Sequence, residues 1–194
     1  MAKFDPRKHH RRSIRLRDYD YSRPGAYYVT ICSHRRECLF GEVVGSEMRY
    51  NEFGRGVCEC WEGLPKRYPN VDLDEWIVMP NHMHGIIVIV DDRCRGGSRT
   101  APTKNVIKRK PLGRLIGAFK TVSTKHINEM RGTPGAMAWQ RGYYEHIIRD
   151  GADLNRIRRY IRNNPARWAE DENNPDNWMW GRFATVPANH DMEV

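Results

Sequence analysis

The stretch NHMHGIIVIV, residues 81–90, decides the fold and raises the first chemical question. An aliphatic run of this length, rich in β-branched residues, indicates a buried β-strand. Side chains alternate between the two faces of a strand, so His82 and His84 share one face, about 6.6 Å apart along it. Neutral imidazole is the most common metal ligand among side chains. The pair is therefore a candidate metal site, and the alternative is two rings at a strand end that contact only water.

Strand and helix patterns alternate on both sides of this stretch. Strands are predicted at 26–34, within 38–50, at 72–80 and 82–90, and at 137–150. The third and fourth are joined either by a turn at Pro80–Asn81 or as one long bent strand. Helices are predicted at 51–69, 112–132 and 153–165. The tight connections favour an α+β fold, with helices packed on one face of an antiparallel sheet.

The ends of the predicted helices carry capping signals. Asn51 begins the first, Gly132 ends the second, Asp153 is the expected N-cap of the third, and Pro165 follows that helix. The second helix has an apolar stripe that predicts its buried side: Leu115, Phe119, Val122 and Ile127.

Charge is distributed unevenly along a chain whose net charge is +9. Residues 1–20 carry seven Lys or Arg against three Asp, residues 91–111 carry seven against two, and residues 169–194 carry six acidic residues against one Arg. We interpret this as a basic arm (1–24), one domain (25–168) with a flexible basic loop at 91–111, and an acidic tail (169–194). The basic blocks favour a nucleic-acid partner, and the alternative is a solvated surface that keeps the protein soluble.

Cysteine usage and hydropathy exclude some classes of protein. Five cysteines without C-x-x-C spacing favour reduced thiols over a disulfide framework or a zinc ribbon. The longest apolar run, residues 85–90, is far shorter than the roughly 20 residues that a membrane span needs. The basic N-terminus lacks the apolar core of a secretory signal. We therefore expect a cytoplasmic protein without a membrane partner.

The last predicted helix supplies candidates for a further ligand and a nucleophile. Tyr160 lies at the edge of an apolar stripe, and Asn164 follows one turn later on the same face. A phenol and a carboxamide stacked in this way could face the histidines across the sheet. The alternative is that Tyr160 is a core residue and that Asn164 only ends the helix before Pro165.

Taken together, these segments resemble the single-tyrosine HUH transposases, and most closely the REP-associated tyrosine transposase branch. The resemblance runs in order over residues 26–168, through MPNHMHGIIVIV, GAFKTVSTKHIN, WQRGYYEHIIRD and RRYIRNNPARW. It implies a ferredoxin-like, RRM-like HUH fold. It also implies an enzyme that cuts and rejoins single-stranded DNA beside hairpins.

By that resemblance, His82, His84 and Asn164 bind a divalent metal, Mg²⁺ or Mn²⁺, and Tyr160 is the nucleophile. Two nitrogens and one amide oxygen suit Mn²⁺ best, although Mg²⁺ is more available in cells. The implied reaction is a transesterification that leaves a 5′-phosphotyrosine and a free 3′-OH. The implied partner is single-stranded DNA with hairpins, which would make the protein nucleoid-associated when bound. Both a monomer and a homodimer stay open.

The roles of four other residues, and three rival functions of the protein, also stay open. Tyr143 and Tyr144 are rival nucleophiles on opposite faces of a predicted strand, although the family pattern favours Tyr160. Lys120 is a candidate for helping the phenol to ionise, and His146 is interpreted as structural. The rival functions are a non-catalytic DNA-hairpin-binding protein derived from a transposase, a phosphodiesterase that uses water, and an RNA-binding module.

Overall fold

A four-stranded antiparallel sheet forms the centre of the molecule, as the computed structural model shows for residue 16 and residues 18–91 and 109–180. Its strands are β1 (Gly25–Cys32), β4 (Val71–Val78), β5 (His82–Ile89) and β6 (Tyr144–Ile148), in the order β4-β5-β1-β6. Along the chain, a segment with two consecutive helices separates β1 from β4, and one long helix separates β5 from β6. This β-α-β-β-α-β order is the ferredoxin-like arrangement. The predicted α+β class and antiparallel sheet are confirmed.

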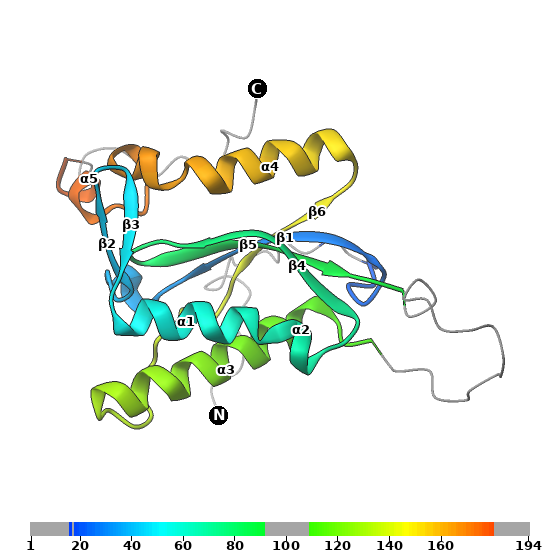
Figure 1. Ribbon diagram of the computed structural model, residues 1–194, viewed down its shortest axis with the longest axis horizontal. Coiled ribbons are helices and arrows are strands. Elements are labelled where there is room, and N and C mark those ends of the chain that lie inside the picture. Colours follow the sequence, from blue (N-terminus) through cyan, green and yellow to red (C-terminus); the bar gives the residue numbers. More distant parts are fainter. Residues whose placement is uncertain (1–15, 17, 92–108, 181–194) are drawn as a thin grey trace, which may run out of the picture.

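Helices cover both faces of this sheet (Figure 1). On one face lie α1 (Glu52–Glu62), the short α2 (Leu64–Arg67) and α3 (Leu112–Arg131), and on the other lies α4 (Gly151–Asn163). The sequence predicted helices on one face only, and the position of α4 on the other face departs from that prediction. The apolar stripe of α4 is buried there against the sheet.

Shorter elements complete the chain around one end of the sheet. A β-hairpin follows β1 through one turn of 3₁₀ helix, and two short helices follow α4. They are η1 (His34–Arg36), β2 (Gly41–Val44), β3 (Glu47–Tyr50), η3 (Pro165–Glu170) and α5 (Pro175–Trp180). In Figure 1 the hairpin and α5 lie at the same end of the molecule.

The larger apolar core lies between the sheet and helices α1 and α3. Alternate residues of the two central strands point into it: Tyr27, Val29 and Ile31 from β1, and Met83, Ile87 and Ile89 from β5. The helices contribute Trp61 from α1, and Leu115 and Phe119 from α3. Gly85 lets a helix side chain approach the sheet closely. A Cβ added there would lie 2.5 Å from Cζ2 of the fully buried Trp61. The indole therefore packs directly on the backbone of β5.

A smaller apolar cluster joins α4 to the other face of the sheet. Its buried members are Tyr28, Ile86, Ile157 and Ile161. An ion pair and a hydrogen bond reinforce it. Arg158 donates to both carboxylate oxygens of Asp74 at 2.7 and 2.6 Å, and the ring of His146 forms a hydrogen bond with Asp153 at 2.7 Å. The position of α4 over β1 and β5 follows from these contacts.

Several local predictions need correction. Asp150, and not Asp153, is the N-cap of α4, because its side chain accepts from the backbone N–H of Asp153. Val122 is 41% exposed, since the side of α3 that faces the sheet is centred on Leu115 and Phe119. The strand predicted at 137–150 is shorter, and Trp139 makes only an isolated bridge.

Other local predictions agree with the structure or lie outside it. Asn51 caps α1 by accepting from Gly54, Gly132 ends α3 in the left-handed conformation, and a turn separates β4 from β5. Most of the basic arm and of the 91–111 loop lies outside the described residues. None of the helices described at 52–67 and 112–180 is both long and apolar enough to cross a membrane.

Candidate metal and nucleophile site

The two histidines meet at the start of β5, on the face that α4 covers. Their Nε2 atoms are 3.1 Å apart, and both side chains are buried. Antiparallel pairing with β1 sets their position, because His82 lies opposite Cys32 and His84 opposite Thr30. The rings therefore converge, as the period of the strand predicts.

Asn81 fixes the proton on His82. Its Nδ2 donates to the carbonyls of Asn173 (2.6 Å) and Arg36 (3.1 Å), which establishes Oδ1 as an acceptor. Oδ1 lies 2.9 Å from Nδ1 of His82, so that nitrogen carries the hydrogen and Nε2 presents its lone pair. Arg36, which offers one of the carbonyls, has a φ of 56°, a left-handed conformation that non-glycine residues seldom adopt.

Two hydroxyl groups hold the other ring nitrogen of His84. Its Nδ1 lies 2.7 Å from Oη of Tyr28 and 2.9 Å from Oγ1 of Thr30. Thr30 donates its own hydrogen to Tyr28, so its oxygen can accept an Nδ1–H of His84. In that tautomer Nε2 of His84 also presents a lone pair. Metal-binding histidines are held in this way, by donating the hydrogen of the other ring nitrogen.

Helix α4 brings Tyr160 and Asn164 to the same place. The Tyr160 ring lies 5.2 Å from the His84 ring, centroid to centroid, and it remains 38% exposed. Asn164, at the C-cap of α4, is buried, and its side chain interacts with those of His82 and Tyr160. Its Oδ1 has no hydrogen bond of ordinary geometry among the residues that the structure describes. A buried acceptor without a donor is costly, and a bound cation would satisfy it.

Burial sets the protonation of the site. It lowers the pKa of His82 from 6.5 to about 4, against the opposing effect of the Asp171 carboxylate, and it lowers the pKa of His84 well below 6.5. Both rings are therefore neutral at pH 7, the form that binds metals. Burial also raises the pKa of Tyr160, and Asp171 adds to this, while the Asn164 carboxamide opposes it. Without added positive charge the phenol keeps its proton at pH 7.

These residues fit a divalent ion. Two nitrogens that each lie about 2.1 Å from one ion at a right angle are about 3.0 Å apart, close to the distance between the two Nε2 atoms. The unpartnered Oδ1 of Asn164 would be a third donor. The ligand set implied by the resemblance is thus chemically consistent with the site.

Sequence reasoning missed Asp171, which it assigned to the acidic tail. Its Oδ2 lies 4.0 Å from Nε2 of His82, and its side chain is 8% exposed. It also missed Asn81, which lies next to the histidine pair. An amide directly before H-x-H is the one signal that could have indicated a residue that orients the first imidazole.

The other candidates take different positions. Tyr144 lies on the face of the sheet that carries the histidines, where its ring contacts Tyr28, whereas Tyr143 packs against the larger core. Lys120 is occupied elsewhere, since its Nζ donates to the carbonyls of Gln140 (2.8 Å) and Gly142 (2.6 Å).

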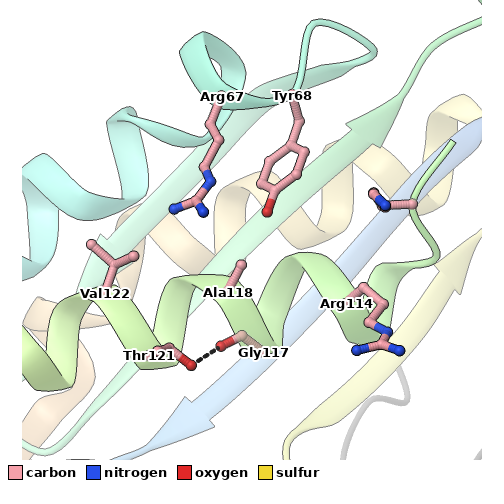
Figure 2. Close-up of a pocket in the computed structure, with 8 residues that line it drawn as sticks. Arg67, Tyr68, Arg114, Gly117, Ala118, Thr121 and Val122 are labelled. Carbon is pink, nitrogen blue, oxygen red and sulfur yellow. Dashed lines mark hydrogen bonds between the residues drawn. The ribbon is translucent and has the colours of Figure 1, made fainter. Parts of the chain in front are cut away.

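A groove lies on the face of the sheet away from the histidines, between α2 and α3. Its volume is about 640 Å³, and its lining includes Arg67, Tyr68, Lys110 and Arg114. Figure 2 shows Arg67 and Tyr68 above the groove and Arg114 below it, on α3. Three cations around one groove suit an anionic ligand.

The solved structures that resemble this chain include two transposases. A REP-associated tyrosine transposase bound to a REP hairpin is 18% identical, with a TM-score of 0.49, over 80% of this chain and 74% of that one. A candidate transposase from Deinococcus radiodurans is 15% identical, with a TM-score of 0.42, over 78% and 97%. Identities and TM-scores this low leave the reaction undecided.

Comparison of sequences gives a closer relative. No family model matches the chain. A Haemophilus influenzae protein, described only as uncharacterized, is 39% identical over 176 residues, which cover 88% of this chain and 97% of the relative. With that identity over nearly the whole of both proteins, the chain belongs to the same family as the Haemophilus influenzae protein.

Proposed function

We propose that this protein is a metal-dependent endonuclease and strand transferase that acts on single-stranded DNA beside hairpins, through a 5′-phosphotyrosine on Tyr160. One observation carries the proposal. Two buried imidazole nitrogens 3.1 Å apart meet a buried carboxamide whose oxygen has no hydrogen bond of ordinary geometry among the described residues, and an exposed phenol lies beside them. The resemblance of the sequence to single-tyrosine HUH transposases supports the same assignment.

The residues divide into ligands and a nucleophile. His82, His84 and Asn164 would hold the divalent ion. When bound, the ion supplies positive charge that polarises a phosphate and favours ionisation of the nearby phenol. Asn81 keeps the hydrogen of His82 on Nδ1, and Thr30 would accept the Nδ1–H of His84 when Nε2 binds the ion.

Tyr160 then carries the covalent step. Its phenolic oxygen loses a proton and forms a bond to phosphorus, while the bond from phosphorus to the 3′-oxygen breaks and that oxygen takes up a proton. The 3′-OH of another strand reverses the step and releases Tyr160. The phosphotyrosine adduct conserves the energy of the broken phosphodiester bond, so the reaction needs no nucleoside triphosphate.

A single chain contains the whole proposed site. Helix α4 packs on its own sheet through Ile157 and Ile161, which brings Tyr160 to the histidines of the same chain. A monomer would therefore meet the requirements of the site. A homodimer would meet them either with two such sites or by exchanging α4 between its subunits.

The basic groove on the other side of the sheet suits the second part of the substrate. Arg67, Lys110 and Arg114 would contact phosphates of a hairpin, whereas the reacting strand would lie at α4. Phosphate contacts of this kind give affinity that depends on salt.

A covalent-adduct assay tests the proposed function. Labelled single-stranded DNA from the hairpin-containing flanks of the protein's own gene is incubated with Mn²⁺, with Mg²⁺ or with EDTA, and the products are separated on a denaturing gel. We expect a metal-dependent band of protein-bound DNA that Tyr160→Phe abolishes. Tyr144→Phe is the matched control, since it removes the same hydroxyl from a ring on the same face of the sheet.

Two outcomes would reject the proposal. Cleavage without an adduct, unaffected by Tyr160→Phe, would indicate a phosphodiesterase that uses water. Binding of hairpin DNA without cleavage or adduct, for a wide set of substrates, would indicate a DNA-hairpin-binding protein without catalysis.

A further inference from the structure

The chain returns to the histidine pair after α4 and η3. Asp171, one residue beyond η3, has a nearly buried carboxylate whose Oδ2 lies 4.0 Å from Nε2 of His82. This is the nitrogen that the proposed function assigns to the metal.

Hydrogen bonds hold Asp171 in this position. Its Oδ1 accepts from the backbone N–H (2.6 Å) and the Nδ2 (2.9 Å) of Asn173, which leaves Oδ2 facing His82. The carbonyl of Asn173 accepts from Asn81, and Asn81 accepts from His82. The four residues form a closed ring of contacts, so the carboxylate and the imidazole are fixed relative to one another.

The groups that meet here are all acceptors. Nε2 of His82 presents a lone pair, Oδ2 of Asp171 is a carboxylate oxygen, and Oδ1 of Asn164 has no donor among the described residues. Acceptors buried together repel one another and have lost their water, which is costly unless positive charge lies between them.

We propose that Asp171 is a fourth protein ligand, through Oδ2, of the divalent cation held by His82, His84 and Asn164. Two donors of one ion, each about 2.1 Å from it, are between about 3.0 Å and about 4.2 Å apart, depending on their angle. The 4.0 Å between Oδ2 and Nε2 of His82 lies within this range. The inference rests on the proposed function, which supplies the cation.

A fourth ligand of this kind changes the character of the site. A carboxylate adds a negative charge and a hard oxygen, which favours Mg²⁺ and Mn²⁺ over softer ions. It also makes the cation depend on the segment beyond α4.

Binding of Mn²⁺ to the full-length protein without DNA tests the inference directly. Calorimetric titration of the wild type and of Asp171→Asn measures the Kd. We expect Asp171→Asn to weaken binding by roughly 10-fold to 100-fold, the range found when groups supporting a metal site are removed. Asn at this position can still accept from Asn173. Glu172→Gln is the matched control, because it removes the same charge from the next, exposed residue and should leave the Kd unchanged.

A second variant separates ligation from a structural role. Asp171→Cys places a soft thiolate at the same position, and it should strengthen binding of Cd²⁺ relative to Mn²⁺ and produce a thiolate-to-Cd²⁺ charge-transfer absorption band. A carboxylate that only supports the fold would give neither change. Melting of the metal-free variants shows whether they are folded.

The outcomes keep the two proposals apart. If His84→Ala abolishes Mn²⁺ binding while Asp171→Asn binds like the wild type and Asp171→Cys gives no band, the fourth ligand is rejected and the proposed function stands. If the wild type itself does not bind Mn²⁺, both the inference and the metal site of the proposed function fail.

Discussion

Gly85→Ala is a sharp test of how β5 is held beneath the histidines. The new Cβ would lie 2.5 Å from Cζ2 and 3.1 Å from Cε2 of Trp61. Carbon atoms in contact are about 3.5–4.0 Å apart, so the overlap is about 1 Å. Trp61 is fully buried and packs edge-on against Phe119, which leaves the ring little room to move. Overpacking of this kind costs about 1–3 kcal/mol of unfolding free energy.

The matched variant is Gly117→Ala. Gly117 lies in α3, and a Cβ there would have no neighbour within 4 Å. Replacing glycine by alanine inside a helix stabilises by about 0.5–1 kcal/mol, because the unfolded chain loses freedom. The same chemical change should therefore have opposite effects at the two positions.

Thermal unfolding of the metal-free protein measures both. For a chain of this size, 1 kcal/mol changes the Tm by roughly 2–4 °C. We expect Gly85→Ala to melt about 2–12 °C lower and Gly117→Ala about 1–4 °C higher than the wild type. A Gly85→Ala protein that melts at the wild-type temperature would refute the described contact between Trp61 and β5.

Three further predictions concern the site and its surroundings. Mn²⁺ at about 100 times its Kd should stabilise the wild type by about 2.7 kcal/mol, and this gain, measured by differential scanning fluorimetry, should be lost in His84→Ala. Arg158 holds the pKa of Asp74 below its ordinary value of 3.8, so their pair should stabilise the fold at pH 7 and lose this effect as the pH falls below 3.8. Urea melts of the wild type and Asp74→Asn at pH 7 and pH 3 check this, and a constant difference between them would contradict it. Arg67→Ala together with Arg114→Ala should reduce the salt dependence of hairpin binding, measured by fluorescence anisotropy, but leave adduct formation on a short strand without a hairpin unchanged.

The sequence could predict which site residues lie together in pairs, because this depends only on the side-chain periodicity of strands and helices. The period of two in a strand puts His82 and His84 on one face, and the period of 3.6 in a helix puts Tyr160 one turn before Asn164. That the two pairs meet is a matter of packing, and the apolar stripe of α4, centred on Ile157, gave the only local indication of it.

Residues whose place is set by the tertiary path of the chain could not be predicted from local periodicity. Asp171 belongs to an acidic segment whose composition indicates solvent exposure, and only the return of the chain after η3 brings it to His82. Val122 fits the period of α3 as well as its buried neighbours do, but the position of the sheet leaves it exposed. The strand predicted from 137 was too long because Trp139 is turned into the core, where its Nε1 donates to Ser123.

The two apolar clusters differ in size, and this difference has a consequence for motion. Among the described residues, the cluster beneath α1 and α3 has nineteen buried members, whereas the cluster beneath α4 has four. The free energy needed to open a helix locally follows the apolar contacts that it loses. We therefore expect the amide hydrogens of α4 to exchange through a partial opening, well before those of α3, which exchange only when the whole domain unfolds. The tyrosine that would carry the DNA thus lies on a helix that should detach more easily than α3, so a strand bound to it could move away from the histidines while the sheet stays folded.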